Sequence, residues 1–339
     1  MSLTYRYFFV LSGEHETLPL SEINAIFEIN SISYEVLKRY HSSVLIETDK
    51  ILSLDILHRL TYTKRVCTLL SIEKNEDALV DFVKNHTFID HHTSSFKVSV
   101  VSKEQKIDTQ SLMQKIGALI QSKTRKKVSL THAEIEYFCI FEDDVLFGET
   151  IFIQKDQFSK RSPKKKPCFS PGTIKTKLSR VLVNLSRIRP GEVLLDPFCG
   201  CGAFLIEAAL MNISIVGFDI NPKIVEYAKK NLEFYNIPSD RIFVSDATSC
   251  EKMSVDAIVC DPPYGRTTKK SVEDLVLLYK NSLSHLSSFL KSGRYFVILS
   301  PDSFDLEGIG KKSGVDLVET HFDRVHKSLT RKICVFRKI

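Results

Sequence analysis

Residues 193–211 read VLLDPFCGCGAFLIEAALM, which is an apolar strand, a turn and an apolar helix in immediate succession. The turn carries glycines at positions 200 and 202, and glycine lets a ligand approach the backbone closely. It follows the carboxyl end of a strand, where open α/β sheets bind their ligands. A glycine pair alone also fits a plain tight turn. The stretch therefore predicts a strand–turn–helix unit of an α/β sheet with a candidate ligand site at its turn.

The same alternation of apolar strands and amphipathic helices extends over residues 176–339. The pattern predicts a parallel sheet covered by helices on both faces. The expected helices span 176–188, 203–211, 222–235, 272–291 and 304–311, and the expected strands span 193–196, 214–219, 241–245, 257–260, 295–299, 317–323 and 332–337.

The N-terminal half has a different order of elements. Residues 1–74 predict a β-α-β-β-α-β series typical of a ferredoxin-like domain. Residues 75–156 predict a second small α+β module. The expected strands are 6–12, 34–41, 43–48, 65–73, 96–101, 128–130, 134–141 and 145–153, with helices at 18–30, 51–61, around 79–83 and at 109–123.

A basic segment separates the two halves. Residues 157–191 contain ten Lys or Arg and no Asp or Glu, in a chain whose net charge is +6. Pro163, Pro167 and Pro171-Gly172 interrupt regular structure and predict an extended connection over residues 157–175. Such a basic stretch is either a contact for a polyanion or a solvated linker.

Composition excludes several classes of protein. The chain of 339 residues is 43% hydrophobic and 26% charged, as expected for a globular protein. It has neither an apolar run of about 18 residues nor a signal peptide, so we expect no membrane span and a cytoplasmic location. Its eight cysteines form no CxxC pair, and we expect free thiols and no metal site.

Acidic residues follow the next two strands of the α/β half. Asp219 lies 23 residues after Asp196, where nucleoside-binding sheets place a carboxylate on the ribose hydroxyls. Asp246-Ala247 ends the following strand and suits adenine recognition, although Asp246 could equally form a turn. The turn lacks the third glycine of a dinucleotide fingerprint, and the chain lacks a Gly-Lys-Ser/Thr phosphate loop, which disfavours NAD and ATP.

The strand after that ends in Asp261-Pro262-Pro263-Tyr264. Two prolines fix the backbone and remove N–H donors, so the corner presents acceptors: the Asp261 carboxylate and the Pro262 carbonyl. Two such acceptors would orient an exocyclic amino group, and Tyr264 would stack on its base. The alternative is a proline-rich turn with a core aromatic residue.

These motifs resemble the S-adenosylmethionine-dependent methyltransferases that act on amino groups. The wider patterns are similar to the archaeal THUMP-containing tRNA guanine-N2 methyltransferases over nearly the whole chain. These patterns are 261–268 (DPPYGRTT), 11–19 (LSGEHETLP) and 324–331 (RVHKSLTR). The resemblance implies ferredoxin-like and THUMP α+β domains ahead of a Rossmann-like methyltransferase domain at 176–339.

The resemblance also implies function. It predicts methylation of the N2 amino group of guanosine 10 in tRNA, once or twice, with the THUMP domain at 75–156 docking the acceptor end. We expect tRNA as partner and a monomer, and the resemblance leaves open whether this chain needs a small activating subunit, as the related eukaryotic enzymes do. This chain departs from the family pattern at Cys201 and Ala203 of the glycine turn and at Ser170 before Pro171-Gly172. These departures bear on the affinity for the cofactor.

We assign site residues accordingly. The predicted catalytic residues are Asp261, Pro262 and Tyr264. The predicted cofactor-binding residues are Asp196, Phe198, Gly200, Gly202, Asp219, Asp246 and Ala247. The predicted RNA-binding residues are Lys160, Arg161, Lys164, Lys165, Lys166, Arg266, Arg331 and Lys332.

The sequence leaves three alternatives open. The same amino-group chemistry fits another RNA guanine, and it also fits a DNA adenine-N6 methyltransferase, although the N-terminal half argues against a DNA enzyme. A non-catalytic tRNA-binding protein that has lost cofactor affinity through the Cys201 and Ala203 changes is the third.

Overall fold

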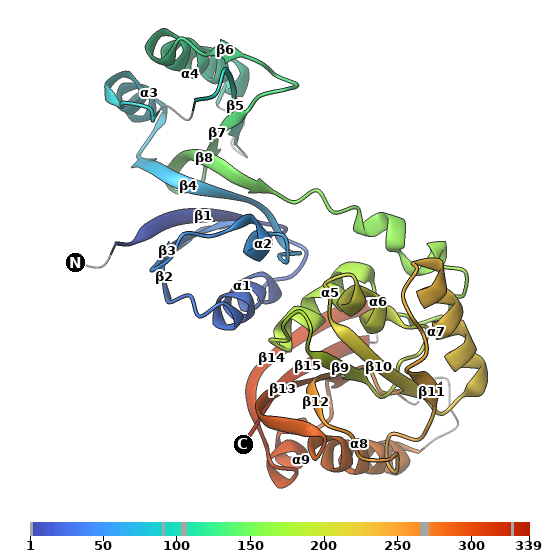
Figure 1. The fold of residues 1–339 in the computed structure, drawn as a ribbon. Helices are drawn as coiled ribbons and strands as arrows, with labels where there is room; N and C mark the ends of the chain where they lie inside the picture. The colour runs from blue at the N-terminus through green and yellow to red at the C-terminus, as the bar shows by residue number, and fades with distance from the viewer. Residues whose placement is uncertain (1–2, 90–91, 103–106, 265–270, 327–328) are drawn as a thin grey trace. The chain divides into compact units, whose positions relative to one another are not determined.

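The computed structural model describes residues 3–89, 92–102, 107–264, 271–326 and 329–339. The chain divides into two compact units (Figure 1). Unit 1 comprises Met1–Glu14, Ile32–His58 and Tyr62–Lys155, and unit 2 comprises His15–Ser31, Arg59–Thr61 and Asp156–Ile339.

Unit 1 is built on an eight-stranded sheet in the order β2-β3-β1-β4-β8-β7-β5-β6. The antiparallel pairing of β4 with β8 joins the strands of the two predicted N-terminal modules in one sheet. The strands are β1 (Tyr5–Leu11), β2 (Tyr34–Arg39), β3 (Ser43–Thr48), β4 (Thr63–Glu73), β5 (Ser95–Val101), β6 (Lys127–Val128), β7 (Ile135–Phe141) and β8 (Val145–Ile153).

Two helices of unit 1 begin at side-chain caps that the sequence supplies. Asn75 accepts a hydrogen bond from the Ala78 amide at the start of α3 (Glu76–Asn85), and Asp108 caps α4 (Thr109–Thr124) in the same way. Their apolar faces pack on the sheet in one core cluster. The third helix, α2 (Leu54–Leu57), is much shorter than the helix predicted at 51–61.

Unit 2 contains a seven-stranded sheet in the order β11-β10-β9-β12-β13-β15-β14. Its first five strands are parallel, but β15 pairs antiparallel with both β13 and β14. The predicted wholly parallel sheet is therefore wrong at this edge, because the two-residue connection between β14 and β15 permits only antiparallel pairing. The strands are β9 (Val193–Asp196), β10 (Ser214–Asp219), β11 (Ile242–Val244), β12 (Val255–Cys260), β13 (Leu290–Pro301), β14 (Val315–His326) and β15 (Leu329–Lys338).

Helices cover both faces of this sheet, as predicted. Figure 1 shows α8 and α9 on one face and α5, α6 and α7 on the other. The helices are α5 (Thr176–Leu185), α6 (Ala203–Ala209), α7 (Pro222–Phe234), α8 (Val272–Ser287) and α9 (Leu306–Lys312). A capping box between Ser271 and Asp274 starts α8, which ends four residues before the predicted end because β13 begins at Leu290.

An additional helix of unit 2 comes from the N-terminal part of the chain. Helix α1 (Leu18–Ile29) packs on α5, and Glu22 of α1 accepts a 2.8 Å hydrogen bond from the amide of the buried Asn184. Among the described residues, no helix is long and apolar enough to cross a membrane.

The basic segment differs from the predicted extended connection. It contains two short 3₁₀ helices, η1 (Phe158–Arg161) and η2 (Pro163–Lys165). Pro163 starts η2, where its fixed φ favours a turn. The Arg161 guanidinium is bonded to the carboxylates of Asp156 and the buried Glu207, and the Glu207 contact holds this turn against α6.

Candidate active site

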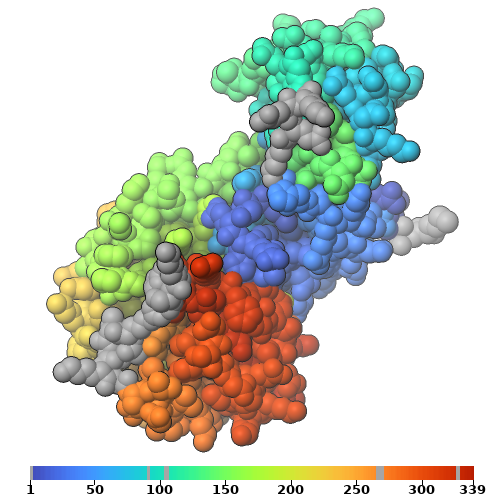
Figure 2. Space-filling model, turned by 180° about the vertical axis from the view of Figure 1, so that it is seen from behind, coloured from blue at the N-terminus to red at the C-terminus, as the bar shows by residue number. Residues whose placement is uncertain are grey.

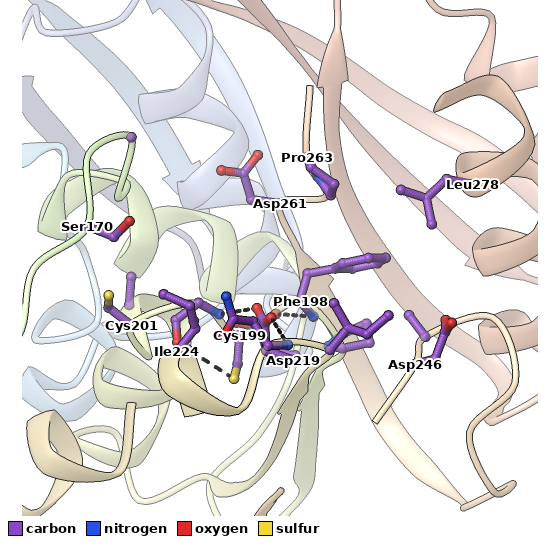
Figure 3. Close-up of a pocket in the computed structure, with 18 of the residues that line it drawn as sticks. Ser170, Phe198, Cys199, Cys201, Asp219, Ile224, Asp246, Asp261, Pro263 and Leu278 are labelled. Atoms are coloured by element: carbon purple, nitrogen blue, oxygen red, sulfur yellow. Dashed lines mark hydrogen bonds between the residues drawn. The ribbon is translucent and has the colours of Figure 1, made fainter. Parts of the chain in front are cut away.

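A cavity of about 1010 Å³ lies at the carboxyl ends of β9, β10 and β12. This is the edge where open α/β sheets bind ligands. Figure 3 shows Asp261 and Pro263 across the cavity from Cys199 and Asp219, with Ser170 and Cys201 at one end and Asp246 and Leu278 at the other. The structure thus brings the acidic ends of three strands to one cavity, as the sequence predicts.

The glycine turn has the conformation that its sequence requires. Gly200 and Gly202 have φ values of +50° and +81°, in the left-handed region that favours glycine. The turn is closed by a 2.8 Å hydrogen bond from the Gly202 amide to the Cys199 carbonyl, and the Cys199 amide donates to the Phe218 carbonyl at 2.9 Å. The backbone between β9 and α6 is therefore fixed close to the cavity.

Asp219 connects this turn to the next loop. One carboxylate oxygen accepts a 3.2 Å hydrogen bond from the Gly200 amide, and the other accepts a 3.0 Å bond from the Asn221 amide. A carboxylate has about four acceptor positions, so two amide contacts leave capacity for ribose hydroxyls. Asn221 itself caps α7, as its position before Pro222 suggests.

The other two predicted acidic residues are held by their own loops. Asp196 is 1% exposed and accepts from the Phe198 amide at 3.2 Å; burial raises its pKa well above the usual value. Asp246 accepts from the amide and hydroxyl of Thr248, at 2.8 and 2.7 Å, which forms a turn beside the buried Ala247. All three line the cavity.

The Asp261 corner departs in detail from the predicted arrangement. The Tyr264 hydroxyl donates a hydrogen bond to the Asp261 carboxylate, and the Tyr279 hydroxyl of α8 donates to the Pro262 carbonyl at 3.3 Å. Burial raises the pKa of Asp261 to about 6, while Arg331 and the Tyr264 hydrogen bond oppose that rise. Among the described residues that line the cavity, the corner contributes Asp261 and Pro263, not Pro262 or Tyr264.

Two relatives match this chain over nearly its whole length. The tRNA (guanine(10)-N2)-dimethyltransferase of Methanothermobacter thermautotrophicus is 32% identical over 333 residues, covering 97% of this chain and 98% of the relative. The protein of the same name from Methanocaldococcus jannaschii is 32% identical, with 98% and 99% covered.

The chain belongs to the tRNA (guanine(10)-N2)-dimethyltransferase family. A family model described as "RMKL-like, methyltransferase domain" matches residues 163–333, and one described as "DNA methylase" matches residues 56–230. The crystal structure of TrmN from Thermus thermophilus is similar in fold, with a TM-score of 0.55, 16% identity, and 99% of this chain and all of that chain covered.

Two further segments line the cavity, and apart from Ser170 the sequence does not predict their residues. Helix α8 contributes Asp274, Leu277, Leu278 and Asn281, whose spacing places them on one helix face. Residues 170–174 of the basic segment line the other end. Leu277 is an exposed apolar residue on an otherwise amphipathic helix. An apolar residue outside the apolar face of a helix is a sequence signal that could have indicated this part of the cavity.

The predicted RNA-binding residues of the basic segment fall into two groups. Lys160, Lys164 and Lys165 are exposed. Lys166 is 8% exposed, and burial lowers its pKa. Arg161 is bonded to two carboxylates. Because a side chain that is buried or already paired has few donors left for phosphate, only the three exposed lysines keep the geometry of a phosphate contact.

The remaining predicted RNA contacts lie near the C terminus and in the Asp261 loop. Arg331 is 7% exposed and donates to the Gly172 carbonyl at 3.3 Å, so it lies inside unit 2 and not on its surface. Lys332 is half-buried, with its ammonium 3.5 Å from the Phe304 carbonyl. Arg266 lies outside the described residues.

Proposed function

We propose that this protein transfers methyl groups from S-adenosylmethionine to the N2 amino group of guanosine 10 in tRNA, first once and then a second time. The observation that carries the proposal is the single cavity that joins the glycine turn and Asp219 to the Asp261 corner. The names of the two full-length relatives supply the substrate and the number of methyl groups.

The residues present fit such a cofactor. Asp219 would accept from the ribose hydroxyls, and the glycine turn would lie against the amino-acid end. Phe198, Ile224 and Ala247 give the cavity an apolar part for the adenine. When bound, S-adenosylmethionine supplies an electrophilic methyl group on its sulfonium.

Asp261 would act on the nucleobase. Its carboxylate accepts a hydrogen bond from the amino group, fixes the direction of the nitrogen lone pair, and stabilises the positive charge that develops there. With a pKa of about 6, Asp261 is ionised near neutral pH and can take the proton that the methylated nitrogen releases onto its carboxylate. A singly methylated amino group keeps one hydrogen, so the same contact serves the second transfer.

The basic segment and N-terminal half would bind the RNA. We propose a ferredoxin-like domain at 1–74, a THUMP domain at 75–156, a basic linker at 157–175 and the catalytic domain at 176–339. Exposed Lys160, Lys164 and Lys165 would contact phosphate. We propose further that the protein acts in the cytoplasm as a monomer. Light scattering during size-exclusion chromatography measures its molar mass and so tests the oligomeric state.

DNA adenine-N6 methylation is the second candidate, because the "DNA methylase" model matches residues 56–230. That match ends before Asp261, the residue that would present the amino group. The RNA assignment therefore rests on the full-length relatives, whose matches span the corner.

Mass spectrometry of nucleosides tests the proposal directly. Unmodified tRNA and duplex DNA are incubated separately with S-adenosylmethionine and the purified chain, the Asp261→Ala variant, or the Asp302→Ala variant, whose aspartate is exposed. We expect N2-methylguanosine and N2,N2-dimethylguanosine from tRNA with the first and third proteins, and a loss of at least 100-fold with Asp261→Ala. N6-methyladenine from DNA would favour the second candidate, and no methylated product from either substrate would reject both.

A further inference from the structure

Arg331 occupies a buried position beside the proposed catalytic corner. It lies on β15 opposite Pro301 of β13 and Asp323 of β14. On the same strands, Ile298 pairs with both Cys260 and Cys334. Pro301 and Arg331 each lie three residues from this row, and three residues beyond Cys260 is Pro263. The register therefore places Arg331 at the height of the corner that starts at Asp261.

The guanidinium contacts the wall of the cavity. One terminal nitrogen donates to the carbonyl of Gly172 at 3.3 Å, and Gly172 lines the cavity together with Asp261. The other terminal nitrogen is 3.6 Å from the Asp323 carboxylate. Arg331 thus ties the antiparallel edge of the sheet to the segment at 170–174.

Arg331 forms an ion pair with Asp323, but among the described residues part of its hydrogen-bonding capacity is unused. The 3.6 Å separation from Asp323 is longer than a hydrogen bond. The Nε atom is buried and has no hydrogen-bond partner within the described part of the chain. A buried cation acts on other charges nearby, since effective screening is weaker inside a protein than in water.

We propose that Arg331 is a positioning residue that keeps Asp261 ionised, so that its carboxylate can accept the amino group of the base. The inference rests on the proposed function, because an ionised Asp261 matters for catalysis only if the corner presents an amino group. It replaces the surface contact with RNA that the sequence alone predicts for Arg331.

The effect on the pKa of Asp261 has a definite sign. Burial raises this pKa, Arg331 and the Tyr264 hydroxyl lower it, and Asp323 raises it. Loss of the Arg331 charge should therefore raise the pKa of Asp261, and loss of the Asp323 charge should lower it. Within the part of the chain that the structure describes, the titratable and charged groups around Asp261 are Tyr264 of the corner, Cys260 of β12, Asp196 of β9, Tyr279 of α8, Asp323 of β14 and Arg331 of β15.

Two readouts on four variants test the inference. The variants are Arg331→Met, Arg331→Lys, Asp323→Asn and the control Arg337→Met, which removes an arginine from an exposed position of the same strand. The first readout is the pH profile of tRNA methylation. The second is NMR titration of ¹³C-labelled aspartate carboxyls in the full chain without cofactor, with the Asp261 signal assigned from an Asp261→Asn sample.

We expect the Asp261 titration and the acid limb of activity to move up by about one pH unit in Arg331→Met and down in Asp323→Asn. Arg331→Lys should retain part of the wild-type position, and Arg337→Met should match wild type. Equal titration in wild type and Arg331→Met would overturn the inference, as would a shift of the same sign in Arg331→Met and Asp323→Asn. If wild type methylates no tRNA while the carboxyl titration still moves as expected, the proposed function fails and the electrostatic role of Arg331 stands.

Discussion

Asn231 of α7 hydrogen-bonds to both Cys168 of the basic segment and Cys201 of the glycine turn. Its amide nitrogen donates to the two carbonyls at 2.9 Å each, and its amide oxygen accepts from the Cys168 amide, also at 2.9 Å. The side chain is fully buried. One residue therefore connects the glycine turn to Cys168, two residues before the cavity-lining stretch 170–174.

Replacement of Asn231 should weaken cofactor binding more than it slows methyl transfer. Asn231→Ala leaves the Cys168 and Cys201 backbone groups without their partners, so the cavity wall loses its anchor. We expect the Kd for S-adenosylmethionine, measured by calorimetry, to rise about 10-fold, with kcat at saturating cofactor within a few-fold of wild type.

Asn184→Ala is the matched control for this variant. Asn184 is also fully buried, and its amide donates to Glu22 and to the Arg59 carbonyl at 2.8 and 2.9 Å, away from the cavity lining. Both variants should lose about 1–3 kcal/mol of unfolding free energy, but only Asn231→Ala should change the Kd. An equal change of Kd in both would show that general destabilisation is the cause.

Tyr264→Phe should make methylation more sensitive to acid. The Tyr264 hydroxyl donates to the Asp261 carboxylate and lowers its pKa. Without that donor the pKa of Asp261 rises above about 6, so the carboxylate is protonated over a wider range as the pH falls. We expect roughly a 10-fold loss of kcat/KM at pH 6 and a smaller loss at pH 8, since a hydrogen bond to a charged group is worth about 1.5–3 kcal/mol.

The pH profile distinguishes this role from base stacking. Phenylalanine keeps the aromatic ring, so a variant whose profile matched wild type would mean that the hydroxyl does not act on Asp261. A loss that was the same at every pH would point to altered packing of the corner.

Most helices and strands of unit 2 could be predicted from the sequence, because residues next to one another in the chain determine where they begin and end. Apolar strands that end in Asp196, Asp219 and Cys260, each followed by a turn or a helix start, define the sheet edge and bring the acidic residues together. Asn221-Pro222 likewise predicted the start of α7. These features depend on neighbours in sequence, which a single chain displays.

Long-range contacts account for what the sequence did not predict. Arg161 and Arg331 look like surface cations, but their partners Glu207 and Gly172 are 46 and 159 residues away. The placement of α1 with unit 2 similarly depends on Asn184, 162 residues from Glu22. The sequence shows that a residue is charged, but it does not show whether a partner far away in the chain holds that side chain in the interior.

Glu207 should contribute strongly to stability. This fully buried carboxylate of α6 accepts from Arg161 at 2.9 Å and from Arg180 at 2.9 Å. Glu207→Gln would leave two arginines without their shared counter-charge, which costs about 3–5 kcal/mol for a buried pair. Urea unfolding followed by circular dichroism should show this loss at both low and high salt, because buried pairs are poorly screened.

The exposed pair of Glu226 and Lys229 provides the comparison. Their charged atoms are 3.6 Å apart, and the Glu226 side chain is 60% exposed. Glu226→Gln should change the unfolding free energy by about 0.5 kcal/mol or less. If Glu207→Gln were equally mild, the buried cluster would not be what anchors the basic segment.

Lys164 and Lys165 should govern the salt dependence of tRNA binding. Both are exposed in η2, and each phosphate contact contributes about 0.7–0.9 to the slope of log K against log salt concentration. Lys164→Gln/Lys165→Gln should therefore reduce that slope by about 1.5 in filter-binding or anisotropy measurements. The double variant Lys311→Gln/Lys312→Gln removes the same charge from exposed positions of α9, away from the basic segment. A smaller loss of slope in the second variant separates direct phosphate contact from the change in net charge, because net charge alone would lower both slopes equally.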